Sequence, residues 1–403
     1  MDICSRDYCT GCGACVIACP KSCISWAKDD LDTLYPAIDE DICIHCDACH
    51  RACHNNAGIE FHLPIKTFAA WTLDEENRQS SASGGITSVF YQYAINRGGF
   101  TCGAELTLDK GVNYIPLKTK DDIKRVKNSK YVFSHTNDIY SHVRQALKDG
   151  RFVFFVGLPC QVAGLKAFLG KQADDENLLT ADLICHGVSN EDYLFQYLHH
   201  IEKRENRKAD TLFFRDPTYG TDSFTFTLKS SDTVFYKQNH YGTNLYYIGY
   251  MDELIYRENC YHCSYARTER ISDLTFGDFD GLGKEKPFNH CNRQVSLCLV
   301  NTPTGESHLR QVADMLFLEE RTLEEAVKPQ RQLKAPSEGH PMRKKFIEEY
   351  KRTHDFTRSA HKVLWKQVRG NRVHKMVNTL FVKPVLRLTT KQQRERIKNL
   401  ISR

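Results

Sequence analysis

Two runs of four cysteines near the beginning of the chain constrain its fold more than any other feature. The first run reads Cys9-x2-Cys12-x2-Cys15-x3-Cys19, and the second reads Cys43-x2-Cys46-x2-Cys49-x3-Cys53. The two runs have the same spacing, and loosely similar residues follow each of them. The front of the chain is therefore an internal repeat of one small cysteine-rich unit.

This spacing is typical of a bacterial-type ferredoxin with two [4Fe–4S] clusters. Three cysteines at two-residue gaps let one tight loop reach three iron corners, while the fourth points to the other cluster. We therefore assign the cysteines to two sets: Cys9, Cys12, Cys15 and Cys53 form the first front set, and Cys19, Cys43, Cys46 and Cys49 form the second front set. Because paired C-x2-C units also bind zinc, two zinc sites are the alternative.

One position departs from the ordinary ferredoxin pattern. His54 stands where a proline is usual after the fourth cysteine, whereas Pro20 follows Cys19 as expected. His45, His50 and His54 either tune the cluster of the second run by hydrogen bonding or are ordinary, partly exposed polar residues. Two further cysteines, Cys4 and Cys23, fall outside the pattern and are expected to be free thiols.

Composition indicates a reducing compartment and more than one domain. The chain has 403 residues, 17 of them cysteine, and 41% of its residues are hydrophobic, enough for two or three domains with a large core. The N-terminal residues lack the apolar segment of a signal peptide, and no run approaches the roughly 18 to 20 apolar residues of a membrane span. We therefore expect a cytoplasmic protein in which clustered thiols bind metal.

A loop of small residues, 80–85, opens a predicted helix. The apolar residues follow helical spacing, and Gly98-Gly99 ends the helix; they are Ile86, Val89, Phe90, Tyr93 and Ala94. Exposed N–H groups at such a helix start favour an anion, and glycines let a phosphate approach closely. A capped helix with a tight entry turn explains the same residues equally well.

The middle of the chain contains a predicted strand–helix–strand unit. Residues 152–156 form a continuous apolar run, typical of a buried parallel strand, which leads through Gly157-Leu158-Pro159 to Cys160 and a helix over 162–169. A second strand over 178–184 ends at Cys185. Parallel strands joined by a crossover end on the same edge of a sheet, so we expect the two cysteines to lie close together.

A later pair, Cys260 and Cys263, precedes a predicted strand over 273–276 and a turn over 277–281. With Cys160 and Cys185 this pair makes four thiols, enough for a third cluster. Three other interpretations stay open at this point. The two sheet-edge cysteines can be small buried core residues, while the later pair can bind zinc or form a redox disulfide.

Four segments together resemble the coenzyme F420 hydrogenase and dehydrogenase beta subunit family, which includes 7-hydroxymethyl chlorophyll a reductase-like members. They are Ser81-Ala82-Ser83-Gly84-Gly85-Ile86-Thr87-Ser88, Gly157-Leu158-Pro159-Cys160-Gln161-Val162-Ala163-Gly164-Leu165-Lys166, Asp182-Leu183-Ile184-Cys185-His186-Gly187, and Cys260-Tyr261-His262-Cys263 running on to Gly277-Asp278-Phe279. The resemblance covers roughly residues 1–335, including the N-terminal double-cluster domain that many members carry.

The resemblance implies an FAD between two α/β modules, with a third [4Fe–4S] cluster beside it. The cluster would bind Cys160, Cys185, Cys260 and Cys263, called the internal set from here on. The implied flavin contacts are Ser83, Gly84, Gly85 and Ser88 at the helix start, and Lys130 in the recurrent segment 128–132. Asp280 stands where members commonly have a tryptophan, so we expect the substrate to differ from theirs.

These observations predict a mixed α+β and α/β fold. We expect a ferredoxin-like domain at 1–63, an FAD-binding α/β module at 64–190, a C-terminal module of the beta subunit type at 191–335, and a basic helical tail at 336–403. Within the third segment, residues 211–250 alternate as strands do, which predicts an antiparallel insertion that either covers a pocket or is a plain hairpin.

The expected function is an iron–sulfur flavin oxidoreductase. Electrons would pass from a ferredoxin or another redox protein through three [4Fe–4S] clusters to FAD, and then to a small organic or deazaflavin (F420-like) substrate. No catalytic residue is assigned. The alternatives are a non-catalytic electron-transfer subunit of a larger redox complex and a zinc-stabilised interaction protein.

The end of the chain carries most of its positive charge. Residues 341–403 hold 18 Lys and Arg against 4 Asp and Glu, whereas the whole chain has a net charge of only +5. Apolar residues at helical spacing make parts of this tail amphipathic, so it either packs on the body, docks on an acidic protein, or lies peripherally on the inner face of a membrane. No base-reading or aromatic-stacking motif supports nucleic acid as a partner.

Overall fold

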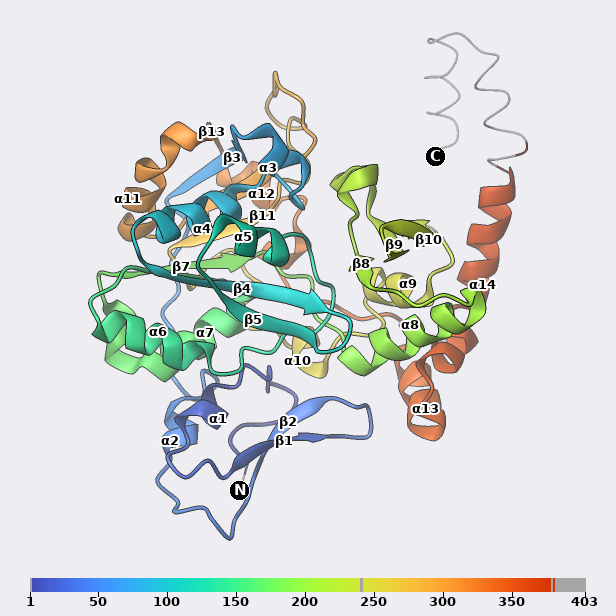
Figure 1. Cartoon of the computed structure of the whole chain (residues 1–403), viewed down its shortest axis with the longest axis horizontal. Coiled ribbons are helices and arrows are strands. Elements are labelled where there is room, and N and C mark those ends of the chain that lie inside the picture. The colour runs from blue at the N-terminus through green and yellow to red at the C-terminus, as the bar shows by residue number, and fades with distance from the viewer. Residues whose placement is uncertain (1, 240–241, 378–379, 381–403) are drawn as a thin grey trace.

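An eight-stranded mixed sheet forms the centre of the molecule (Figure 1). The computed structural model describes residues 2–239, 242–377 and 380. The strand order is β13-β3-β12-β11-β7-β6-β4-β5. The strands are β3 (Lys66–Thr72), β4 (Phe100–Thr107), β5 (Gly111–Leu117), β6 (Val153–Gly157), β7 (Leu178–Leu183), β11 (Leu274–Asp278), β12 (Ser296–Val300) and β13 (Leu316–Arg321). The four strands β4, β6, β7 and β11 run parallel, and the flanking pairs are antiparallel.

Helices cover both faces of this sheet (Figure 1). One face packs against α4 (Ile86–Asn96), α5 (Lys120–Val126) and α11 (Pro303–Gln311), and the other packs against α6 (Ile139–Lys148) and α7 (Pro159–Leu169). All five residues of β6 are buried, with Phe154 facing the first layer and Phe155 facing the second. Because successive strand side chains point to opposite faces, all the apolar side chains of this run are buried only if helices cover both faces of the sheet. The predicted strand–helix–strand unit is confirmed.

The front of the chain folds into a small unit of its own, drawn in blue in Figure 1. Its elements are α1 (Ala14–Ala18), β1 (Ile24–Lys28), β2 (Leu34–Ile38) and α2 (Ala48–Arg51), with the two strands paired antiparallel. Helix α1 packs against α6 and α7 of the body. The ferredoxin-like front domain predicted from the cysteine spacing is thus confirmed, and it lies against the helical layer that contains Cys160.

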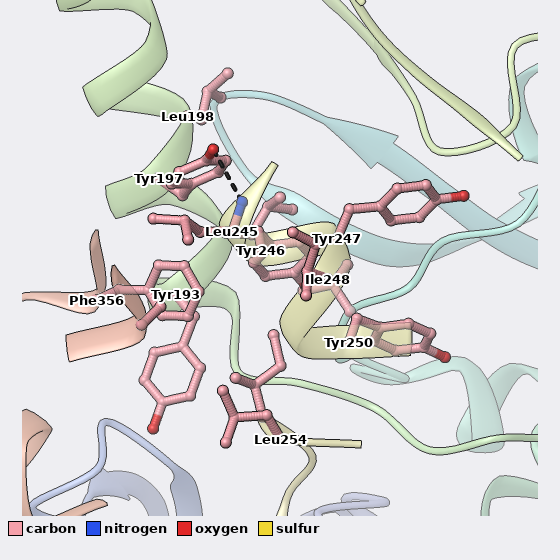
Figure 2. Packing of buried hydrophobic residues seen from close by; sticks show 14 of the residues in the cluster. Tyr193, Tyr197, Leu198, Leu245, Tyr246, Tyr247, Ile248, Tyr250, Leu254 and Phe356 are labelled. Carbon is pink, nitrogen blue, oxygen red and sulfur yellow. Dashed lines mark hydrogen bonds between the residues drawn. The ribbon is translucent and has the colours of Figure 1, made fainter. Parts of the chain in front are cut away.

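A second, smaller sheet is inserted between β7 and β11. Its antiparallel strands are β8 (Thr211–Phe213), β9 (Thr225–Ser230) and β10 (Thr233–Asn239), with helices α8 (Glu191–Glu205) and α9 (Leu245–Met251) beside it. The antiparallel insertion expected over 211–250 is present, and residues 240–241 of it lie outside the described residues. Aromatic side chains of α8 and α9 fill its core, where Tyr197 accepts a hydrogen bond from the Leu245 amide (Figure 2).

The remaining helices lie near the sheet's edge and at the end of the chain. They are α3 (Glu75–Gln79), α10 (Glu258–Tyr261), α12 (Leu323–Val327), α13 (Arg343–Thr353) and α14 (Phe356–Val377). The predicted helical tail is observed in α13 and α14, whose residues Phe346, Tyr350 and Phe356 are buried against α8 and α9. The rest of the tail, residues 378–379 and 381–403, lies outside the described residues.

Two further points concern the predicted organisation of the chain. Helix α8 begins at Glu191, next to the predicted boundary at residue 190, while β11, β12 and β13 from beyond that boundary return to the central sheet. The domain boundaries therefore stay a prediction. Across the described residues, no helix is long and apolar enough to cross a membrane.

Candidate functional site

The four cysteines of the internal set surround one pocket. Cys160 lies in the first turn of α7, Cys185 follows the end of β7, Cys260 lies in α10 and Cys263 follows two residues after that helix. All four line a pocket with about 970 Å³ of empty space, part of it open to solvent. The expectation that Cys160 and Cys185 meet at one sheet edge is confirmed, and the later pair joins them there.

Burial and mutual repulsion oppose the thiolate form of the internal set. Burial raises the pKa of the Cys160 thiol well above its usual range, and the neighbouring sulfurs of Cys185, Cys263 and Cys260 raise it further. Burial also raises the pKa of Cys260 to about 11. Positive charge between these sulfurs, such as the iron of a [4Fe–4S] cluster would supply, would stabilise the thiolate form that binds metal.

The start of α7 holds Cys160 by a network centred on Gln161. The strand ends at Gly157, and Pro159 occupies the first turn, where a missing N–H costs nothing. The Gln161 side chain accepts from the Leu158 amide at 3.0 Å and donates to the Ser134 hydroxyl at 2.9 Å. This fixes the strand-to-helix turn, and with it the direction of the neighbouring cysteine.

The loop after Cys263 is tied to the strand that precedes Cys185 by a buried ion pair. Arg270 Nη2 lies 2.7 Å from Asp182 Oδ1, and both side chains are almost fully buried. Arg270 also donates to the backbone oxygen of Tyr265 at 3.0 Å. Sequence reasoning missed this pair, although an aspartate within a predicted buried strand signals that a cation must lie nearby.

The front cysteines are grouped as their spacing predicts. The four members of the second front set line a second pocket, which Cys23 also lines, its Sγ 3.3 Å from Cys19 Sγ. In the first front set, burial raises the pKa of Cys15, and the sulfurs of Cys12, Cys9 and Cys53 raise it further, so these four also lie together. Cys12 lines the internal pocket as well, so the first front set is the one that borders the internal set.

Comparison with known proteins supports the suspected family. Residues 150–326 match the model of a family described as the C terminus of the coenzyme F420 hydrogenase/dehydrogenase beta subunit, and residues 8–57 match a 4Fe-4S dicluster domain. The chain is related to this beta subunit family. It is an iron–sulfur electron-transfer protein with an N-terminal dicluster domain, as the sequence predicted.

Two individual proteins are similar to parts of this chain. An uncharacterized ferredoxin from Methanocaldococcus jannaschii is 40% identical over 55 residues, which is 14% of this chain and 70% of the ferredoxin. A chain in a solved structure of the F420-reducing [NiFe] hydrogenase complex from Methanosarcina barkeri matches with 19% identity and a TM-score of 0.41. That match covers 68% of this chain and 88% of the other.

The glycine-rich loop expected to contact a flavin packs closely on the central sheet. A Cβ atom at Gly84 would lie 2.3 Å from the Ala70 oxygen, and Gly85 has a φ of +80°, so both positions need glycine. The Ser83 hydroxyl donates to the Val295 oxygen at 3.0 Å, and the partly buried Ser88 donates its amide to the Gly85 oxygen. The fold alone thus accounts for these glycines, whatever they bind.

Lys130 lies at the end of α5. Its ammonium donates to the backbone oxygens of Val126 and Lys127 at 2.7 and 2.6 Å, where the last turn of the helix leaves carbonyls without an intrahelical partner. Burial lowers the pKa of Lys130 to about 7. The flavin contacts at Ser83, Gly84, Gly85, Ser88 and Lys130 stay a prediction.

A buried arginine of the insertion forms an ion pair with the turn that contains Gly277, Asp278 and Phe279. Arg215 Nη1 lies 2.7 Å from Asp278 Oδ2, and its guanidinium lies 4.3 Å from the centre of the Phe224 ring. Burial raises the pKa of Asp280, and the charge of Asp278 raises it further. Charged groups therefore gather at this turn, where the resemblance led us to expect a different substrate.

Proposed function

We propose that this protein is an iron–sulfur flavoenzyme that passes electrons from a ferredoxin-type donor to an organic or deazaflavin (F420-like) substrate. In this proposal the eight front cysteines hold two [4Fe–4S] clusters, and the internal set of Cys160, Cys185, Cys260 and Cys263 holds a third. The observation that carries the proposal is the internal set around one pocket, with Cys12 of the first front set on the same wall.

The clusters and the flavin would supply complementary chemistry. Clusters exchange single electrons, and a flavin holds one or two, so together they join a one-electron donor to a hydride-type reaction. The chain contributes position: Gln161 fixes the turn at Cys160, and the Asp182–Arg270 pair ties the loop after Cys263 to β7. We place the substrate beside the charged groups of this chain around Asp278, which pairs with Arg215.

Helix α4 supports the proposed FAD site. Gly85 caps this helix of 11 residues in a left-handed conformation, and within the described structure no side chain accepts hydrogen bonds from its first turn. Free amides at a helix start favour a phosphate, which the flavin dinucleotide carries. We assign Ser83, Gly84, Gly85 and Ser88 to that contact, with Lys130 near the flavin.

The second front set supports a docking site for the donor. Cys46 is exposed, and the neighbouring side chains of Ile42 and Ile44 are 50% and 54% exposed. A ferredoxin or another redox protein can approach the cysteine loop here without passing the body. We further propose a cytoplasmic location with peripheral contact between the basic tail and an anionic membrane surface.

Anaerobic purification with quantification of iron, sulfide and flavin per chain tests the proposed function. We expect about twelve iron atoms and one FAD, since three clusters of four irons fill the three sets. Changing Cys160→Ser or Cys263→Ser should remove about four of these irons and leave the front pair. Flavin together with about eight irons in the unmodified protein would refute the internal cluster.

Two other outcomes would favour the alternatives. A colourless preparation without iron would support zinc sites. A preparation with full iron and flavin that turns over only with a copurifying partner would support an electron-transfer subunit of a larger complex; the family's description likewise names a beta subunit.

A further inference from the structure

His54, the residue in place of the usual proline, lies at the junction between the front domain and the body. It follows Cys53, the fourth ligand of the first front set, and only 4% of its surface is exposed. Proline has no side-chain donor or acceptor, whereas an imidazole has two nitrogens that must find partners when buried. The partners of His54 therefore show what the substitution accomplishes.

Both nitrogens of His54 are hydrogen-bonded. Nδ1 lies 2.7 Å from the hydroxyl of Tyr265, and Nε2 lies 3.0 Å from the hydroxyl of Thr10. Tyr265 is itself 7% exposed and stands two residues after Cys263 of the internal set. Thr10 directly follows Cys9 of the first front set, and it lines the internal pocket together with Cys12. A continuous path thus runs from the first front set through Thr10, His54 and Tyr265 to the internal set.

The same two sets also meet at helix α7. A Cβ atom at Gly164 would lie 2.7 Å from Cys12 Sγ, so the front cysteine rests directly on this helix. Gly164 is four residues after Cys160, and residues at that spacing share one face of a helix. The internal ligand and the front ligand are therefore held on the same side of α7.

The second front set has no comparable connection to the body within the described part of the chain. Pro20 occupies the position equivalent to His54, and the exposed Cys46 does not line the internal pocket. Proline therefore follows the cysteine that belongs to the second front set, and histidine follows the cysteine that belongs to the first front set, which borders the internal set.

We propose that the hydrogen-bonded bridge Thr10–His54–Tyr265 is the joint that couples the first front set to the internal set. His54 and Tyr265 are positioning residues in this proposal, which rests on the proposed function. In the loaded protein one electron leaves one set and arrives at the other, while no bond breaks and no proton moves. The bridge supplies a bonded path and a fixed separation for that exchange.

Tyr265→Phe is the sharpest test, because it removes one hydroxyl and keeps the buried ring. We expect unchanged iron and flavin content. The rate at which electrons reach the internal cluster after rapid mixing with dithionite, followed by freeze-quench EPR, should fall by about 10- to 100-fold, the effect typical of losing a residue that orients a metal ligand. Tyr93→Phe is the matched control: it removes the hydroxyl of another buried tyrosine, which donates to Gln311 at 2.7 Å on the face of the sheet opposite α7, and the rate should stay the same.

His54→Pro restores the ordinary ferredoxin residue and breaks the bridge from its other side. If the bridge acts as one unit, the double variant His54→Pro/Tyr265→Phe should be no slower than the slower single variant. Two losses that multiply, or a Tyr265→Phe rate equal to that of the unmodified protein at full iron content, would overturn the proposal. An unmodified protein with only about eight irons would instead overturn the proposed function, so the two failures can be told apart.

Discussion

At the scale of single residues, the site depends on close approaches that only small side chains permit. Gly164 is the clearest example, because it lies within a helix, where glycine is normally unfavourable. Its role is to let Cys12 rest on α7. A second helical glycine, Gly370 in α14, has no such neighbour: a Cβ there would meet nothing within 4 Å among the described atoms.

These two glycines make a matched pair for mutation. Gly164→Ala should displace Cys12, because the new methyl group would lie 2.7 Å from its sulfur, and the first front set should lose its cluster, about four irons. Gly370→Ala should keep all iron and stabilise the protein by up to about 1 kcal/mol through helix propensity. Iron per chain and the thermal midpoint check both outcomes, and full iron in Gly164→Ala would contradict the packing argument.

Residue roles could be predicted from the sequence only where spacing alone encodes them. The eight front cysteines repeat at fixed intervals, and two of the internal ones end parallel strands, so their grouping could be predicted. The contacts of His54 with Tyr265, and of Asp182 with Arg270, join residues far apart in the chain. No local pattern specifies such pairs, although each contains a polar group that needed a buried partner.

At the scale of elements, local patterns identified β6 and β7 to within one residue, and α7 except for its first three residues. The long-range pairing of β3 with β12 and β13 could not be predicted, because strand partners that distant are chosen by the whole core. For the helix that begins after Gly85, the sequence left a phosphate site and a simple tight turn open. The contacts of Gly84 with the sheet account for that glycine by packing and leave both interpretations open.

The end of helix α5 offers a pH test. Because burial lowers the pKa of Lys130 from 10.5 to about 7, the unfolded chain keeps this proton over a range in which the folded chain has released it. The contribution of Lys130 to the free energy of unfolding therefore rises with pH across that range. We expect Lys130→Met to be less stable by about 1–3 kcal/mol, since two carbonyls lose their donor.

The pH dependence separates this explanation from a general loss of packing. The difference in thermal midpoint between the unmodified protein and Lys130→Met should widen from pH 7 toward higher pH. A constant difference would show that Lys130 does not titrate in this range. Lys124→Met is a suitable control, because Lys124 lies on the exposed side of the same helix.

At the scale of the whole molecule, an exposed apolar segment and a basic segment follow one another near the end of the chain. The buried half of α14 packs Leu364 and Val368 into the aromatic core, while its last turns expose Val373, Met376 and Val377. Residues 378–403 then add seven basic side chains and one acidic one. A body that is acidic overall thus ends in a basic segment that follows an exposed apolar one.

Removing residues 378–403 tests the proposed membrane contact. The truncated protein should keep its iron and its fold, since α13 and the first half of α14 still cover the aromatic core. Its binding to anionic phosphatidylglycerol vesicles should fall at least roughly tenfold in cosedimentation, because each basic residue near such a surface contributes about 1 kcal/mol. Equal binding by both proteins, or equal binding to neutral vesicles, would contradict the membrane role.

The order of the cysteines along the chain also determines the order in which the three cysteine sets can be completed during synthesis. Each front set takes its fourth member from the other run, so the second front set is complete only when Cys49 has left the ribosome and the first only when Cys53 has. The internal set must wait until the inserted sheet has been made and Cys263 has followed it. Because domains fold as they emerge, the front unit can receive its iron while the body is still being synthesised. The body would then fold against a front domain that is already folded and in which Cys12 and His54 are already in place.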